Sequence, residues 1–210
     1  MAGPRNAHLK IVTRGARYAK LGMGILDAPF SLDAARATRI KALVEAHFDF
    51  IWRSLRRLGV PPADADDAAQ EVFLVAARRL DRIEVTRERA FLFATAMRTA
   101  STFRRTVRRH PEDPSPALED YQASGLNPEE ESDLLRARSI LQSILDAMPI
   151  EQRSVFILAE LEELESPAVA EILEIPLGTV YSRLRSAREA FAGAARRLSA
   201  RESFTRSARR

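Results

Sequence analysis

The sequence predicts an all-α protein made of two small helical domains joined by a flexible acidic linker. Three observations support this fold class. The chain of 210 residues contains only 8 glycines and is rich in Ala, Leu, Glu and Arg, which favour helix. Apolar residues recur at three- and four-residue spacing through most of the chain. No stretch of useful length alternates apolar and polar residues in the way that a half-buried strand requires.

Charged residues occur in blocks that mark the domain boundaries. The net charge is only +4, but residues 98–109 carry five arginines and no acid. Residues 112–133 carry eight acids and no Lys or Arg, and prolines interrupt any helix there. We therefore divide the chain into a basic N-terminal extension predicted to be disordered (1–35), a first helical domain (36–109), an acidic Pro-rich linker (110–132), a second helical domain (133–198) and a basic tail (199–210).

The first domain is predicted to contain three helices. The first ends where Gly59 and Pro61 interrupt its periodicity, and the second, near 64–80, begins with acids that suit a helix N-terminus. The third, near 87–109, is apolar at its start and ends in arginines. The stripes of the first two helices that we expect to face a core are Ile40, Leu43, Val44, Phe48, Ile51, Leu55 and Leu58, then Ala68, Val72, Val75 and Ala76.

The second domain is predicted to begin with two helices, near 134–148 and 150–164, separated by Pro149. A short helix follows, with Ser166 as its N-cap and Pro167 at its first position. After a turn at 174–176, a further helix begins near Gly178 and Thr179. The apolar stripe of the opening helix comprises Leu134, Ile140, Leu141, Ile144 and Leu145.

The last two helices of this domain form the pattern of a helix-turn-helix. In the second of them, one narrow stripe must face the core, and it consists of Val180, Leu184, Ala187 and Phe191. Arginines and hydroxyl groups occupy the other faces, and the planar donors of arginine suit phosphates and guanine edges. A helix that reads DNA fits this pattern, and so does a solvated basic surface helix, so the periodicity leaves both interpretations open.

Several classes of protein are disfavoured. There are no cysteines and three histidines, of which His8 and His110 lie in segments predicted to be flexible and His47 stands alone on a helix. No nucleophile–base pair or glycine-rich phosphate loop appears, so we expect no enzymatic activity, no cofactor and no metal. Adjacent acids on a helix point in different directions, which disfavours a metal site at 64–67. No apolar run approaches the roughly 20 residues of a spanning helix, so we expect a cytoplasmic protein without membrane insertion.

Two segments together resemble a known family. "DADDAAQEVFLVAARRLDRI" (64–83) resembles region 2 of the extracytoplasmic-function (ECF) sigma factors of the sigma-70 family. "ILDAMPIEQRSVFILAELEELESPAVAEILEIPLGTVYSRLRSARE" (144–189) resembles their region 4. The resemblance covers roughly 43–198 and includes the order of the segments and the acidic linker between them.

The resemblance implies a subunit of RNA polymerase. In this family, region 2 docks on the β′ clamp helices of core RNA polymerase and melts the −10 promoter element. Region 4 docks on the β flap and reads the −35 element in the major groove, and the linker runs through the RNA exit channel. An anti-sigma factor often holds such proteins, and nothing in the sequence shows one.

The family's functional positions can be transferred residue by residue. The polymerase-binding positions match Asp66, Asp67, Gln70 and Glu71, although acids here would also favour the helix dipole or cap the helix. The −10 element would meet the loop 81–89 and then Arg98, Arg104, Arg105 and Arg108, with aromatic side chains such as Phe91 and Phe103 nearby. The −35 element would meet Thr179, Tyr181, Ser182, Arg183, Arg185 and Arg188.

Some residues depart from the family pattern. Phe91 stands where a tryptophan is common, Thr99 where an asparagine is common, and "LES" at 164–166 where "GLS" is usual. Glu174 stands where the helix-turn-helix usually has a glycine. We therefore expect either a reshaped turn or a left-handed Glu174 that costs roughly 1 kcal/mol.

An alternative function is a helix-turn-helix regulator that binds DNA without acting as a polymerase subunit. That function predicts a ligand pocket or a dimerisation helix in 36–109 and gives no reason for the region 2 pattern. Residues 1–35 lie outside the resemblance, and we interpret them as a disordered arm, an amphipathic partner segment or the product of a start codon placed too early.

Overall fold

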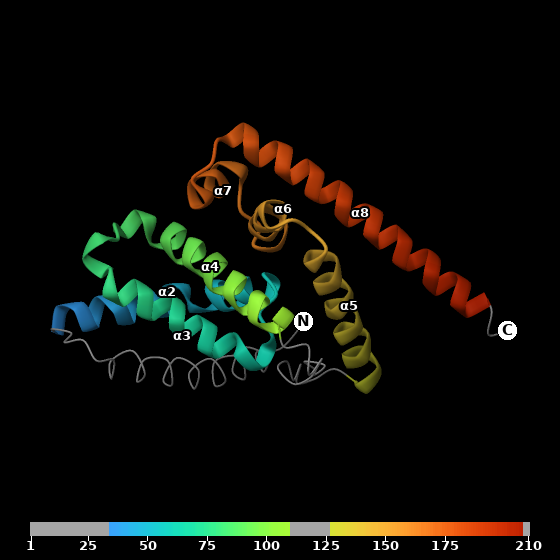
Figure 1. Ribbon diagram of the computed structural model, residues 1–210, viewed down its shortest axis with the longest axis horizontal. Helices are drawn as coiled ribbons and strands as arrows, with labels where there is room; N and C mark the ends of the chain where they lie inside the picture. The colour runs from blue at the N-terminus through green and yellow to red at the C-terminus, as the bar shows by residue number, and fades with distance from the viewer. Residues whose placement is uncertain (1–33, 110–126, 208–210) are drawn as a thin grey trace, which may run out of the picture. The chain divides into compact units, whose positions relative to one another are not determined.

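The computed structural model describes residues 34–109 and 127–207, and the regular elements in these ranges are all helical (Figure 1). The prediction of an all-α fold is confirmed. The chain divides into two compact units, Met1–Leu135 (unit 1) and Arg136–Arg210 (unit 2), and the division falls inside one helix. Within the described ranges, no helix combines the length and the apolar character needed to cross a membrane.

Unit 1 contains a bundle of α2 (Ala34–Arg57), α3 (Pro62–Arg78) and α4 (Glu88–Arg109), which lie side by side in Figure 1. Two 3₁₀ turns, Leu80–Arg82 and Val85–Arg87, connect α3 to α4. All seven apolar residues predicted for the α2 stripe are buried. The left-handed Gly59 (φ 101°) closes α2, as its sequence position predicts.

Small side chains on α3 allow the three helices to approach closely. The buried face of α3 contains five alanines, together with Val72 and Phe73. Val75, which we expected on this face, is only partly buried, and Phe73 takes the core position instead. Phe73 stacks on Phe48 of α2 with 6.4 Å between ring centroids, so one large residue fills the space between two helices.

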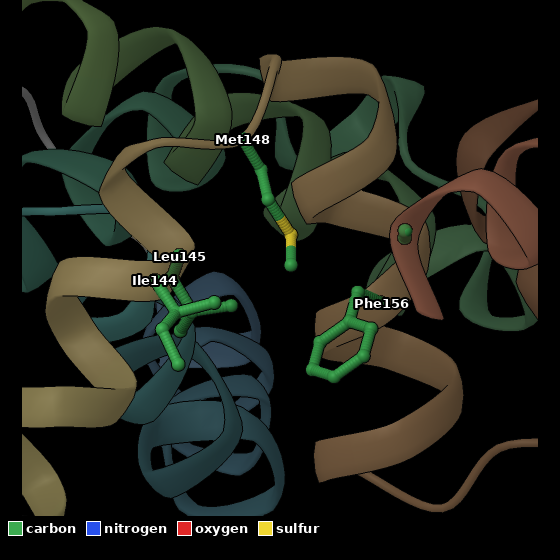
Figure 2. Close-up of a cluster of buried hydrophobic side chains, with 5 residues drawn as sticks. Ile144, Leu145, Met148 and Phe156 are labelled. Carbon is green, nitrogen blue, oxygen red and sulfur yellow. The ribbon is translucent and has the colours of Figure 1, made fainter. Parts of the chain in front are cut away.

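Unit 2 is built around the end of α5 (Pro128–Asp146), α6 (Ile150–Phe156), α7 (Ser166–Leu173) and the long α8 (Leu177–Ser207) (Figure 1). Its core brings together α5, the connection to α6, α6 and α8, and Figure 2 shows Phe156 facing the side chains from the α5 end. The buried members of this core are Ile144, Leu145, Met148, Phe156 and Ala187.

Two helices of unit 2 extend beyond the predicted boundaries. α5 begins at Pro128, inside the predicted linker, because Asn127 caps it: the Asn127 side chain accepts from the Glu130 N–H at 2.8 Å, and the Glu130 carboxylate accepts from the Asn127 N–H at 3.1 Å. α8 continues through Ser207, so the predicted tail is in large part the same helix. Residues 1–33 and 110–126, which hold most of the predicted extension and linker, lie outside the described residues.

Candidate nucleic-acid and polymerase interfaces

The turn of the helix-turn-helix keeps the left-handed conformation that normally favours glycine. α7 ends at Leu173, and Glu174 has φ 52° and ψ 44°. The Ile175 N–H donates to the Ala170 carbonyl at 3.1 Å across the turn, which is the bonding pattern of a Schellman motif. We expected either a reshaped turn or a left-handed Glu174. The structure has the left-handed Glu174, and the turn is not reshaped.

The segment before α7 differs from the sequence prediction. α6 continues into a π-helical turn, Ile157–Leu161, in which the Glu162 N–H donates to the Ile157 carbonyl at 2.9 Å. Glu163 follows with φ 53°, a second left-handed residue that is not glycine. α7 begins at Ser166 itself, and the preceding Glu165 makes no side-chain capping bond, so the predicted N-cap is wrong by one position.

The first turns of α8 form the proposed recognition helix. It begins at Leu177, slightly before the predicted start at Gly178 and Thr179. Its predicted inner stripe is buried at Val180, Leu184 and Ala187. The remaining stripe residue, Phe191, stacks on Phe156 at 5.2 Å between centroids and is partly buried. This packing fixes which face of α8 points outward.

The predicted −35 residues have different surroundings on the outer faces of the recognition helix. Tyr181 and Ser182 are exposed, whereas Thr179 and Arg183 are partly buried. The Arg185 side chain is 82% exposed and lies 3.7 Å from the Glu189 carboxylate, one turn further along α8. A long exposed arginine with a weak local ion pair can extend toward a base edge or a phosphate.

Arg188 makes a contact that its position in the sequence does not predict. Its Nε and Nη2 atoms both donate to Oε1 of Glu160, at 2.9 Å and 2.6 Å. Glu160 lies in the π-helical turn, 28 residues earlier in the chain. The sequence also gave no reason to select Leu177, which is 38% exposed and lies one turn before Tyr181, whose exposed fraction is 55%.

The predicted polymerase-binding residues lie together on α3, but one of them has an internal role. Asp67 and Glu71 are exposed one helical turn apart, and Gln70 is partly buried beside them. Asp66 accepts a hydrogen bond from the indole Nε1 of Trp52 at 2.8 Å, which ties α3 to α2. α3 follows Pro61 without a side-chain capping bond, so capping does not account for these acids.

The predicted −10 arginines follow one another along α4. Arg98 is exposed and donates to the Thr95 hydroxyl at 3.0 Å, and Arg105 is exposed further along the helix. Arg104 is partly buried, and the side chain of Arg108 lies outside the described residues. Among the aromatic residues of α4, Phe93 is fully buried, whereas Phe91 and Phe103 are partly buried and keep some accessible surface.

Side chains of α2 anchor the loop that precedes α4. Arg36 Nη1 donates to the Asp81 carboxylate at 2.8 Å, and Arg39 donates to the Ile83 carbonyl. Arg39 also lies 3.5 Å from one oxygen of Glu88, and His47 Nε2 lies 3.6 Å from the other. Burial lowers the pKa of His47, with Arg89 acting in the same direction and Glu88 opposing both.

Family models match both units of the chain. The model described as "Sigma-70 region 2" matches residues 43–110, and the model described as "Sigma-70, region 4" matches residues 138–191. The solved structure of CnrH in complex with the cytosolic domain of CnrY has a TM-score of 0.55 at 21% identity, covering 85% of this chain and 94% of that one. The sigma factor RpoE in complex with the anti-sigma factor NepR from Bartonella quintana has a TM-score of 0.54 at 19% identity, covering 74% and 96%. The class of protein that the fold and these models define is therefore the sigma-70 family of RNA polymerase sigma factors.

Similarity to curated proteins gives the group within this family. The chain is 31% identical over 172 residues to the ECF RNA polymerase sigma factor SigE of Mycolicibacterium smegmatis, covering 80% of this chain and 65% of that relative. It is 32% identical to the ECF RNA polymerase sigma-E factor of Escherichia coli K12, and the match covers 62% of this chain and 73% of that relative. It is 30% identical to the ECF RNA polymerase sigma factor SigW of Bacillus subtilis 168, and the match covers 70% of this chain and 84% of that relative. The chain belongs to the ECF sigma factors of the sigma-70 family.

Proposed function

We propose that this chain binds core RNA polymerase and directs it to promoters, with unit 1 acting at the −10 element and unit 2 at the −35 element. The orientation of α8 carries the proposal. Because Val180, Leu184 and Ala187 are buried, the opposite face of the helix points outward and carries the exposed Tyr181, Ser182 and Arg185. A major groove admits an α-helix that presents such a face.

The polymerase contact that we propose is the exposed part of α3. Asp67 and Glu71 offer two carboxylates one turn apart, and Gln70 lies beside them. Asp66 is committed to Trp52, so its contribution to docking is to hold α3 in place. The exposed Arg98 and Arg105 of α4 would hold the backbone of single-stranded promoter DNA electrostatically.

This proposal places the protein in the cytoplasm, where promoter DNA and core polymerase are found, and gives it a binding role rather than a catalytic one. The acidic linker, most of which falls in 110–126, would occupy a basic channel of the polymerase. We also propose that an anti-sigma factor regulates the chain, as the structural relative RpoE was solved in complex with NepR.

Transcription with purified core RNA polymerase on genomic fragments tests the proposal. Promoter-specific initiation that depends on this protein is the expected result. Binding to DNA without any binding to core would instead support a conventional helix-turn-helix regulator, and the absence of initiation would refute the proposal.

Two sets of variants separate the roles of the units. Asp67→Ala with Glu71→Ala should weaken core binding, and Glu45→Ala, an exposed acid on α2, is the matched control. Arg185→Ala should leave core binding intact and reduce −35 discrimination by about 1–3 kcal/mol. Arg196→Ala, also exposed on α8 but beyond the helix-turn-helix, should change neither. Equal loss of core binding in both sets would show that the division of roles is wrong.

A further inference from the structure

Arg185 and Arg188 lie on neighbouring turns of α8 but have different surroundings. Arg185 is 82% exposed, and its one polar contact within 34–109 and 127–207 is with Glu189 at 3.7 Å. Arg188 has two short hydrogen bonds to one oxygen of Glu160, which belongs to another helical segment. The distances of 2.6–2.9 Å are those of charge-assisted hydrogen bonds. One predicted DNA contact is thus available to a partner, and the other is already occupied.

The position of Glu160 depends on the π-helical turn. α6 packs along α8, as the stacked Phe156 and Phe191 rings show, so the end of α6 passes close to Arg188. The π-turn bonds each N–H one residue further back than an α-helix does, which changes the direction of the side chains within it. Glu160 lies in this turn and reaches Arg188 across the two helices.

The pair is accessible enough to be exchanged. The side chains of Arg188 and Glu160 are 62% and 32% exposed, so a phosphate could replace the carboxylate as the partner of Arg188. While the Glu160 carboxylate stays in place, its negative charge offsets the positive charge of Arg188. The same carboxylate repels a phosphate that approaches Arg188. A Lys or Arg that contacts phosphate adds affinity for DNA of any sequence through the release of counterions. Withholding Arg188 therefore lowers the general affinity of the recognition helix for DNA.

We propose that Glu160 is a positioning residue that withholds Arg188 from DNA phosphates and keeps the −35 contact weak. This inference rests on the proposed function, because it concerns the same recognition helix. If unit 2 binds the −35 element weakly, stable binding to DNA requires unit 1 to bind the −10 element at the same time. Linked modules gain avidity only when both of their sites are present. The pair thus favours promoters that carry both elements over DNA that carries one.

Salt-dependent binding of the full chain to short duplexes tests the inference. The probes are a −35 duplex taken from a promoter identified by transcription and a scrambled duplex of the same length. Glu160→Gln should bind both duplexes roughly threefold to tenfold more tightly, and the slope of log K against log salt should become steeper by about 0.9, the value for one additional phosphate contact. Glu160→Asp, which shortens the side chain but keeps a carboxylate near the phosphate, should steepen the slope by less.

Matched variants separate this mechanism from a simple change in charge. Glu165→Gln removes the same charge from the connection before α7, where Glu165 makes no capping bond, and should leave the slope unchanged. In an Arg188→Gln background, Glu160→Gln should give no gain. A gain that persists without Arg188, or a Glu160→Gln protein with an unchanged slope and only a lower unfolding midpoint, would overturn the proposal. Failure of the wild type to prefer the −35 duplex would count against the −35 role proposed for unit 2, and the slopes on the scrambled duplex would still decide the role of Glu160.

Discussion

The two segments that we propose to face promoter DNA are held in place by different combinations of forces. In unit 1, the loop before α4 buries Leu80 and Ile83. It is also tied to α2 by polar contacts, because Arg36 binds Asp81 and Arg39 binds the Ile83 carbonyl and approaches Glu88. In unit 2, the recognition helix is fixed by a buried apolar stripe and by the backbone turn at Glu174. Its ion pair to Glu160 is an addition to this packing.

Because of this difference, we expect the two segments to respond differently to salt, pH and substitutions. Apolar burial involves no ionisable group and changes little with moderate salt, so the recognition helix should respond mainly to changes in its core and its turn. The loop of unit 1 depends in part on charged groups that are partly exposed, so ionic conditions and single polar substitutions should loosen it. Four substitutions test this contrast, in order of the expected effect on the free energy of unfolding.

Leu184→Ala should produce the largest effect. Leu184 is 5% exposed and lies at the centre of the stripe that holds α8, so its truncation leaves a cavity and should cost about 3 kcal/mol. Chemical denaturation monitored by circular dichroism measures this loss. Arg185→Ala, the neighbouring exposed substitution, should change stability by less than about 0.5 kcal/mol. Similar losses in both variants would show that the stripe does not hold the helix.

Arg39→Ala should have an intermediate effect that is confined to the loop. It removes the donor to the Ile83 carbonyl and the cation beside Glu88, and should cost about 1–2 kcal/mol. Hydrogen exchange should accelerate at the Ile83 and Arg87 amides, which close the two 3₁₀ turns. Lys41→Ala removes an exposed pair to Glu45 at 3.9 Å and should leave these amides unchanged. Acceleration spread over the whole of unit 1 would contradict local anchoring by Arg39.

Glu174→Gly should stabilise unit 2 by up to about 1 kcal/mol. Glycine adopts the left-handed conformation at φ 52° without the clash that a side chain suffers. Glu171→Gly, in the last turns of α7, should have the opposite sign and cost about 1 kcal/mol, because the residue there is helical. Thermal unfolding of the two variants gives this comparison directly. A loss of stability in Glu174→Gly would mean that contacts of the Glu174 side chain outweigh the strain.

The sequence predicted what depends on periodicity and missed what depends on long side chains meeting across helices. Apolar spacing gave the α2 stripe and the buried face of α8, because 3.6 residues per turn determine which residues share a face. The pairs Arg188–Glu160 and Trp52–Asp66 join exposed or amphipathic groups, and nothing in their spacing indicates that they meet. The π-turn has no recognised sequence signal here. The start of α5 at Pro128 could have been predicted from Asn127 and Glu130, which form a capping box.

Substitution of His47 should have the smallest effect on the free energy of unfolding. The effect should depend on pH in unit 1 and be absent from unit 2. Burial lowers its pKa below the ordinary 6.5, so between the folded and unfolded pKa values the unfolded chain binds more protons. The stabilising contribution of neutral His47 is therefore complete above 6.5 and is lost as the pH falls toward its folded pKa. The free energies of unfolding of wild type and His47→Gln should converge as the pH falls through this range. In the wild type, hydrogen exchange should accelerate at the loop amides of unit 1 and stay unchanged at the amides of α8. A difference between the two proteins that does not change with pH would show that protonation of His47 has no part in holding the loop.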